Sequence, residues 1–355
     1  MKLCFVLPGY SKSPAGGYKI IYEYANRLVN EGYEIVLLYY NENTLKRFHL
    51  PDPMRKMAAN YLVKRGPSWF SLDRRILSLS LFDNDFDKKM FGVDVVVYTS
   101  VDTVFSSYYL LDKYNKNLKK MYFIQDYESW STTDGDVQKT YELNMKNIVI
   151  SEWLKKIVDK YSQKPSILIK DPIDLNIYKI NKPIRSRKPH TIGLLYHTML
   201  HKGLKYSIAA VQQLKKKYPD LDVYMFGVPK RPKEFPSWIH YTKNASQQQT
   251  VEIYNKVSVW LCATVDEGFG LTGLEAMACG DVLVSTAYTG VFEYAKDGYN
   301  ALLSPVKDVD ALVKNVEQVF EDEELRDKLV CNAQESVKDF SWDIAVDKFE
   351  EAIKQ

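Results

Sequence analysis

Two glutamates, Glu267 and Glu275, bracket a glycine-rich segment that reads Glu-Gly-Phe-Gly-Leu-Thr-Gly-Leu-Glu. The apolar, β-branched run 257–263 precedes it and predicts a buried strand, while a helical pattern follows it. At the start of such a helix, the amides of Leu271 to Leu274 lack intrahelical partners and share the positive end of the helix dipole. Because ligands of open α/β sheets bind at the carboxyl ends of strands, the segment predicts a site for an anion such as a phosphate.

The residue types inside this segment fit such a site. Its glycines, Gly268, Gly270 and Gly273, let a ligand approach the backbone closely. We expect Glu275 in the first turn of the helix, where the dipole stabilises a carboxylate. The alternative for Glu267 is a solvated loop charge, and for Glu275 a simple dipole partner.

A second candidate segment runs from Tyr196 to Gly203, between a predicted strand and a predicted helix. Lys202 in this segment is a candidate phosphate-binding cation, and an ordinary surface lysine is the alternative. His197 and His201 have helical spacing, but no carboxylate accompanies them as a metal site would require. Asp-x-Asp triplets at 83–85, 134–136 and 220–222 lie in turn-forming contexts, so we predict no metal site.

The N-terminal half offers two further candidates. Gly16 and Gly17 lie between a predicted strand and a predicted helix, where they would bind a phosphate through backbone amides or form a flexible turn. Gln125 and Asp126 end another predicted strand in polar residues. Asp126 is a candidate catalytic group or a structural cap.

Strand and helix patterns alternate in both halves of the chain, which predicts two parallel, doubly wound sheets. We expect an N-terminal domain at 1–178, a linker at 179–190, a C-terminal domain at 191–339 and a closing helix at 340–355. The linker is polar, basic and interrupted by proline. Predicted strands cover residues 2–7, 33–39, 93–98, 121–124, 148–150 and 166–169 in the first half, and 191–195, 221–226, 239–241, 257–262 and 282–285 in the second.

Composition bounds the remaining possibilities. The chain has 355 residues, 46% of them hydrophobic, and a net charge of +3. Its four cysteines include no Cys-x-x-Cys pair, and no apolar run reaches the roughly 20 residues of a membrane span. We therefore expect a cytoplasmic protein with reduced thiols.

Basic charge is concentrated between residues 46 and 75, next to Trp69 and Phe70. This stretch would contact anionic lipid headgroups at the inner face of the cell membrane, or would simply be solvated. Its cations are Lys46, Arg47, Arg55, Lys56, Lys64, Arg65, Arg74 and Arg75.

The block from Glu267 to Gly280 resembles the acidic signature of the retaining nucleotide-sugar glycosyltransferases of the GT-B fold, family four. The resemblance extends over nearly the whole chain. It implies an α/β fold of two Rossmann-like parallel-sheet domains that face a cleft, with the C-terminal helix crossing back to the first domain. It also implies that no metal and no cofactor are needed, because the nucleoside-diphosphate sugar is the donor substrate.

The resemblance implies roles for the candidate residues. Glu267 would position the donor sugar, Lys202 would bind the diphosphate, and Glu275 would hold the ribose hydroxyls. The remaining donor-binding positions would be Gly16, Gly17, His197, Gly270, Leu271, Thr272 and Gly273. His197 departs from the family pattern, which has arginine there, so only one N–H is available for the phosphate when the imidazole is neutral.

A second departure concerns the donor sugar. Gln125 stands where the wider family has histidine, and Asp126 matches the aspartate that follows it. The sequence Gln-Asp-Tyr-Glu resembles a subgroup that transfers rhamnose from dTDP-rhamnose. Because a 6-deoxy sugar has no 6-hydroxyl for a histidine to bind, the replacement by Gln125 makes chemical sense.

The resulting prediction is a retaining glycosyltransferase of cell-surface polysaccharide synthesis. It would transfer rhamnose to a hydroxyl of a glycan or lipid-linked acceptor, and no nucleic acid would be a partner. The alternatives are a UDP-hexose or UDP-HexNAc transferase of the same fold, a nucleotide-sugar epimerase, and a non-catalytic nucleotide-sugar-binding subunit.

Overall fold

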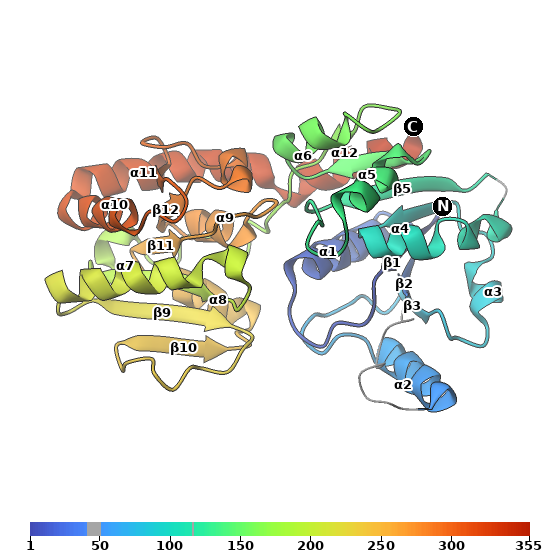
Figure 1. Cartoon of the computed structure of the whole chain (residues 1–355), viewed down its shortest axis with the longest axis horizontal. Coiled ribbons are helices and arrows are strands. Elements are labelled where there is room, and N and C mark those ends of the chain that lie inside the picture. Colours follow the sequence, from blue (N-terminus) through green and yellow to red (C-terminus); the bar gives the residue numbers. More distant parts are fainter. Residues whose placement is uncertain (41–50, 116) are drawn as a thin grey trace. The chain divides into compact units, whose positions relative to one another are not determined.

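The computed structural model describes residues 1–40, 51–115 and 117–355. The chain divides into two compact units, Met1–Lys170 with Val346–Gln355 and Asp171–Ala345, here called unit 1 and unit 2 (Figure 1). Each unit is built around one parallel sheet with helices between the strands. The predicted fold of two Rossmann-like parallel-sheet units is therefore confirmed.

Unit 1 contains a seven-stranded sheet of order β3-β2-β1-β4-β5-β6-β7. All six predicted strands are present within about two residues of their expected ends, and β3, at the sheet edge, is additional. The strands are β1 (Lys2–Leu7), β2 (Glu34–Tyr39), β3 (Leu77–Ser80), β4 (Val95–Tyr98), β5 (Lys119–Ile124), β6 (Lys146–Val149) and β7 (Ile167–Leu168). The helices are α1 (Gly16–Asn30), α2 (Asp52–Arg65), α3 (Phe86–Met90), α4 (Val101–Ser107), α5 (Asp134–Glu142) and α6 (Glu152–Val158), with the 3-10 helix η3 (Leu110–Tyr114).

Unit 2 contains a six-stranded sheet of order β10-β9-β8-β11-β12-β13. The strands are β8 (Thr191–Tyr196), β9 (Asp222–Gly227), β10 (Ile239–Lys243), β11 (Val259–Cys262), β12 (Val282–Thr286) and β13 (Ala301–Ser304). The helices are α7 (Leu204–Lys217), α8 (Gln247–Tyr254), α9 (Leu271–Ala278), α10 (Val309–Glu321) and α11 (Glu323–Ser336), and α12 (Trp342–Lys354) begins in unit 2 and continues into unit 1. Short 3-10 helices are η4 (Ile184–Ser186), η5 (Leu200–Lys202), η6 (Thr289–Glu293) and η7 (Val337–Phe340).

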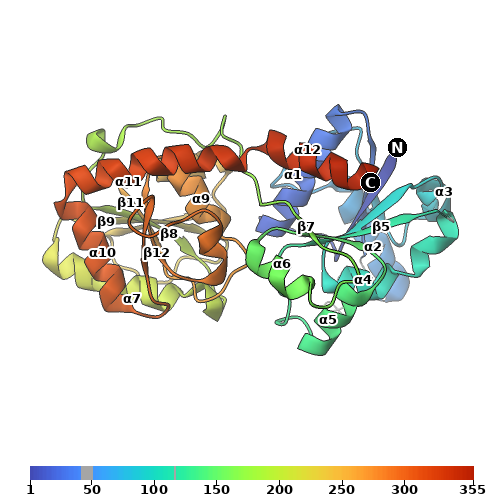
Figure 2. The ribbon, with the colours of Figure 1, turned by 90° about the horizontal axis from the view of Figure 1, so that it is seen from above.

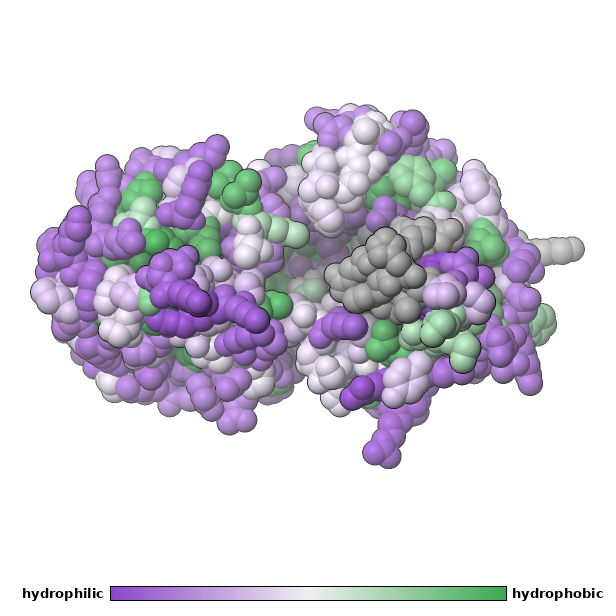
Figure 3. Space-filling model, turned by 60° about the horizontal axis from the view of Figure 1, so that its bottom comes forward, coloured by the Kyte–Doolittle hydropathy of each residue, from purple (hydrophilic) through white to green (hydrophobic). Residues whose placement is uncertain are grey.

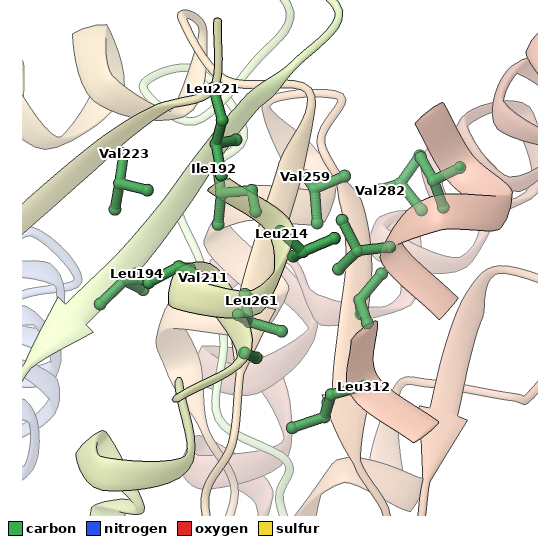
Figure 4. Close-up of a cluster of buried hydrophobic side chains, with 14 of the residues drawn as sticks. Ile192, Leu194, Val211, Leu214, Leu221, Val223, Val259, Leu261, Val282 and Leu312 are labelled. Carbon is green, nitrogen blue, oxygen red and sulfur yellow. The ribbon is translucent and has the colours of Figure 1, made fainter. Parts of the chain in front are cut away.

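The core of unit 2 explains why its central strands could be recognised from the sequence. Side chains of β8, β11 and β12 meet those of α7 and α10 in one buried cluster (Figure 4). Ile192, Val259 and Val282 have at most 1% of their surface exposed. Strands covered on both faces are nearly continuously apolar, so they stand out from the polar connections.

The segment 179–190 is anchored in unit 2 by one buried arginine. Arg187 donates to the carboxylate of Asp281 at 2.5 Å and to the carbonyls of Tyr254 and Cys279 at 2.9 and 2.5 Å. The side chains of Arg187 and Asp281 are fully buried. This network joins the segment before β8 to the end of α9, and removing either charged partner would leave the other charge buried and unpaired.

The C-terminal helix returns to unit 1, as the predicted crossing helix requires. Figure 2 shows the end of α12 beside α1, where the ring of Phe349 lies 4.9 Å from that of Tyr24. Phe349 also stacks on Phe5 of β1 at 5.9 Å. Lys119 and Lys146 donate to carbonyls in the last turn of α12, at 3.2 and 2.8 Å, and so satisfy groups that a helix end leaves open.

The surface in Figure 3 is mostly hydrophilic, with hydrophobic side chains in smaller patches. Within the described residues, no helix is long and apolar enough to cross a membrane.

The predicted basic stretch carries less free charge than its composition suggests. Lys46 and Arg47 lie outside the described residues, and Arg55 is buried with 7% of its surface exposed. Several of its cations pair with carboxylates: Arg55 with Asp52 at 3.0 Å, Lys64 with Asp83 at 3.4 Å, and Arg75 with Asp73 at 2.7 Å. The attraction to an anionic surface is correspondingly smaller.

We predict that Phe349→Ala destabilises unit 1 by about 3–5 kcal/mol, the usual cost of removing a buried aromatic ring. Phe349 has no exposed surface, whereas Glu351 on the same helix is exposed. The matched control Glu351→Ala should change stability by less than about 0.5 kcal/mol. Urea denaturation measures both variants, and equal midpoints would show that α12 does not complete the core of unit 1.

Candidate active site

Lys202 and Glu267 form an ion pair in unit 2. Lys202 follows β8 and Glu267 follows β11, and these neighbouring strands are where the strand order of the sheet reverses. Such a reversal is where open α/β sheets bind ligands. The Lys202 and Glu267 side chains remain 19% and 24% exposed, so a ligand can reach both.

A backbone contact between the two loops brings this pair together. Gly203 has a φ of 66°, and a Cβ atom there would lie 1.8 Å from the carbonyl oxygen of Ala263. The amide of Val265 donates to the carbonyl of His201 at 2.7 Å. The loops therefore pack backbone against backbone, which only glycine permits at position 203.

The imidazole of His197 is neutral and has a defined tautomer. Its Nδ1 lies 3.1 Å from the amide nitrogen of Met199 and accepts that hydrogen bond. Burial, followed by the charges of Lys202 and His201, lowers the pKa of His197 below its ordinary value of 6.5. Nε2 therefore carries the proton at pH 7 and is the one N–H that His197 can donate to a ligand.

The glycine-rich turn before α9 is supported from behind by two tyrosines. A Cβ atom on Gly270 would lie 1.9 Å from the Tyr288 hydroxyl, and one on Gly273 would lie 2.5 Å from the Tyr294 hydroxyl. Tyr294 donates to the carbonyl of Gly270 at 2.9 Å, and Tyr288 donates to that of Phe269 at 3.3 Å. These contacts fix the start of α9, where the amides of Leu271 and Thr272 begin the helix.

Sequence reasoning missed Tyr288 and Tyr294. The sequence did show that both tyrosines come just after the predicted strand at 282–285. This position places them at the carboxyl edge of the sheet, where Lys202 and Glu267 also lie. The same segment supports the acidic loop, because a Cβ atom on Gly290 would lie 2.6 Å from the carbonyl oxygen of Glu267. Gly273 also differs from the expectation of a free amide, since its N–H donates to the carbonyl of Gly270 at 3.0 Å.

The expected place of Glu275 in the first turn of the helix was wrong. Because α9 begins at Leu271, Glu275 lies in the second turn, and the first turn contains no acidic residue. Glu275 is 6% exposed, and its Oε2 accepts a hydrogen bond from the Tyr254 hydroxyl at 2.9 Å. This hydrogen bond helps to orient the Glu275 carboxylate.

In unit 1, Gly17 and Gln125 lie against each other. A Cβ atom on Gly17 would be 3.1 Å from Oε1 of Gln125 and 3.3 Å from its Nε2. Gly16 is the first residue of α1, and no side chain caps that helix end. The carboxylate of Asp126 accepts the amide of Tyr127 at 2.9 Å.

Among the described residues, no group of three or more His, Cys, Asp or Glu side chains is arranged to hold a metal ion. His197 and His201 in particular are not part of such a group.

Comparisons with known proteins find similarity to glycosyltransferases. Residues 179–336, less than half of the chain, match the family model for glycosyl transferases group 1. An uncharacterized glycosyltransferase of Methanocaldococcus jannaschii is 24% identical over 65% of this chain and 61% of its own length. The N,N'-diacetylbacillosaminyl-diphospho-undecaprenol alpha-1,3-N-acetylgalactosaminyltransferase of Campylobacter jejuni is 27% identical over 55% of this chain and 50% of its own. The chain thus spans about half to three-fifths of these relatives.

Solved structures resemble the whole chain in fold. Sucrose-phosphate synthase from Thermosynechococcus elongatus has a TM-score of 0.76 at 14% identity and covers 100% of this chain and 98% of its own. HepE from Anabaena, in complex with UDP and glucose, has a TM-score of 0.73 at 14% identity. The likeness covers 100% of this chain and 99% of the HepE chain. The fold is GT-B. These likenesses show the fold, and the match to glycosyl transferases group 1 at residues 179–336 lies within unit 2.

We predict that Gly203→Ala destabilises unit 2 more than Gly298→Ala does. The two glycines have similar φ values, 66° and 69°, but a Cβ atom on Gly298 meets nothing within 4 Å. Both variants should lose about 1–2 kcal/mol of stability, because alanine is disfavoured in the left-handed backbone conformation. Only Gly203→Ala adds the clash with Ala263, which should cost about 1–3 kcal/mol more. Urea denaturation compares them, and equal losses would mean that the two loops do not depend on their backbone contact.

Proposed function

We propose that this protein is a glycosyltransferase that moves a sugar from a nucleoside diphosphate to a hydroxyl group of a glycan or lipid-linked acceptor. The observation that carries the proposal is the arrangement of Lys202, Glu267 and the first amides of α9 at one sheet edge of unit 2. A cation and helix amides fit a diphosphate, and a neighbouring carboxylate fits sugar hydroxyls.

In the proposed mechanism, Lys202 and the amides of Leu271 and Thr272 stabilise the charge that develops on the departing diphosphate. The Nε2–H of His197 adds one neutral donor. Glu267 hydrogen-bonds the donor sugar and stabilises positive charge at its anomeric carbon. Because Lys202 is paired with Glu267 before any ligand binds, its ammonium is already held at the site and loses little freedom on binding.

We further propose that the transfer retains the anomeric configuration. The departing phosphate would accept the proton of the acceptor hydroxyl, so no strong general base is required, and Asp126 is at most an auxiliary group. Product analysis with labelled donor separates this reaction from epimerisation, which forms a new sugar without an acceptor, and from binding without turnover.

Rhamnose from dTDP-rhamnose is the proposed donor, and the observation behind it is Gln125. Its amide lies against Gly17. By the resemblance, Gln125 would stand in place of a histidine that binds a 6-hydroxyl, which rhamnose lacks. A UDP-sugar is the second candidate, favoured by the UDP in the structure of HepE. Surface-polysaccharide synthesis remains the proposed setting.

We predict that one nucleotide sugar raises the melting temperature selectively in a panel of dTDP-rhamnose, UDP-glucose, UDP-N-acetylglucosamine, UDP-galactose and GDP-mannose. A ligand at a hundred times its Kd adds about 2.7 kcal/mol, which a thermal shift detects. A selective shift with dTDP-rhamnose would support the proposed donor. A selective shift with a UDP-sugar would identify that sugar as the donor instead of dTDP-rhamnose. If no nucleotide sugar in the panel raises the melting temperature of the folded protein, the proposed donor site is contradicted.

Lys202→Ala and Glu267→Ala should each lower kcat/KM by at least about tenfold, since loss of one charge-stabilising group commonly costs more than that. The assay measures release of nucleoside diphosphate from the donor that the panel selects. Lys205→Ala is the matched control, because Lys205 is an exposed lysine at the start of the following helix. A wild-type rate for Lys202→Ala would remove that residue from the mechanism.

We also propose that α2 contacts anionic lipid at the inner face of the cell membrane. Met54, Met57 and Tyr61 are 57%, 73% and 65% exposed, and their spacing places them on one face of the helix. Ala59 and Val63 on the opposite face are buried. Exposed Arg65 ends the same helix, so apolar and basic groups would meet the lipid together.

Wild-type protein should sediment with phosphatidylcholine vesicles only when they contain phosphatidylglycerol. The double variant Met57→Asp/Tyr61→Asp should bind at least about tenfold less, because it replaces apolar contacts with charges that the lipid repels. Phe91→Asp, a change at another exposed apolar residue of unit 1, serves as the control. Equal binding to vesicles with and without phosphatidylglycerol would contradict the proposed contact with anionic lipid.

A further inference from the structure

The loop between β1 and α1 leads into Gly16 and Gly17, and its backbone is held by a side chain from another part of unit 1. The indole Nε1–H of Trp69 donates to the carbonyl of Ser11 at 3.1 Å. Trp69 lies between α2 and β3, 58 residues further along the chain. The middle of the loop is therefore attached to a segment that is remote in the sequence.

A second hydrogen bond joins the same two segments. The hydroxyl of Tyr10 donates to the carbonyl of Gly66 at 3.0 Å. Gly66 directly follows α2, and its amide donates to the carbonyl of Val63 inside that helix at 3.0 Å. One bond alone would let the loop pivot about a single point, whereas the two bonds together fix its position and its direction.

The segment that carries Trp69 is itself anchored on α1. The rings of Trp69 and Phe70 lie 5.6 and 5.3 Å from the ring of Tyr22, a residue of α1 with no exposed surface. Further along α1, Oδ1 of Asn26 accepts the amide of Asp73 at 2.8 Å. The indole is thus oriented by packing, and its N–H has a fixed direction toward the loop.

The end of the loop is accessible to a ligand. Gly16 and Gly17 are exposed, and α1 starts there without a side-chain cap. The first amides of a helix have no partner inside the helix and are available to an anion. The Tyr18 hydroxyl donates to the carbonyl of Gly9 at 2.7 Å and accepts the amide of Gly9 at 3.3 Å. Because this contact joins the start of the loop to α1, a shift of the loop backbone would move these amides.

We propose that Trp69 is a positioning residue for sugar transfer, whose N–H holds the β1–α1 loop at Ser11 so that the amides of Gly16 and Gly17 are in place for the donor diphosphate. Trp69 acts through the loop and not by contact with the donor. Without this hydrogen bond, the donor has to order the loop as it binds, which lowers its affinity. The effect on the donor rests on the proposed function, whereas the effect on the loop does not.

The first test measures amide hydrogen exchange of residues 9–17 in the full chain without nucleotide. Trp69→Phe keeps an aromatic ring against Tyr22 but removes the N–H that Ser11 accepts. Exchange in this loop should become at least about threefold faster, because one hydrogen bond fewer opposes its opening. Exchange that equals that of the wild type would overturn the proposal.

The second test measures kcat and the donor KM through release of nucleoside diphosphate. Trp69→Phe should raise the donor KM at least about threefold and leave kcat within about twofold, because the bound donor orders the loop before the chemical step. An unchanged KM contradicts the positioning role. A wild type that consumes no donor contradicts the proposed function, and the exchange test does not depend on that result.

Phe70→Leu separates positioning from packing. Phe70 contacts the same Tyr22 ring, whereas the hydrogen bond to Ser11 comes from Trp69. Phe70→Leu should therefore lower the melting temperature and leave the donor KM within about twofold of the wild-type value. An equal rise of KM in Phe70→Leu and Trp69→Phe would assign the effect to packing and contradict the proposed role of the N–H.

Tyr10→Phe provides an independent check if Trp69→Phe does not fold. This variant removes the hydroxyl that donates to Gly66 and keeps the ring. It should speed exchange of residues 9–17 and raise the donor KM, as Trp69→Phe does. If neither quantity changes in Tyr10→Phe, the segment after α2 does not hold the loop, and the proposal is overturned.

Discussion

The candidate donor site in unit 2 depends on the contact of two backbones at Gly203 and Ala263. Lys202 and Glu267 belong to different loops, and each loop starts from a different strand. Long side chains alone would meet only part of the time, because holding two of them in one geometry costs conformational entropy. The backbone contact places the two side chains within reach, so the ion pair needs little further ordering.

Burial then sets the charges around this contact. His197 is desolvated and lies near Lys202, so it remains neutral and Lys202 is the principal cation of the described site. Glu275 is oriented by Tyr254, whose pKa burial raises so that its hydroxyl stays protonated and donates. The site thus contains one positive group, oriented carboxylates and neutral donors, a combination suited to a ligand with both phosphate and hydroxyl groups.

The sequence predicted the elements of this site better than their contacts. Central strands such as β8 and β11 are apolar because they are covered on both faces, whereas the four-residue strands β3 and β13 at the sheet edges were missed. The segments around Lys202 and Glu267 were recognised separately, since residue type and strand ends are visible in a sequence. Their ion pair, the two tyrosines behind Gly270 and the second-turn place of Glu275 depend on side-chain packing, which no local pattern encodes.

The return of the chain to unit 1 affects the order in which the protein folds during synthesis. Residues 346–355 complete the core of unit 1 through Phe349, yet the ribosome makes them only after all of unit 2. Unit 2 is one continuous segment and has all its residues earlier. The apolar surface around Phe5 and Tyr24 therefore stays uncovered while the second half of the chain is translated, and the core of unit 1 is completed last.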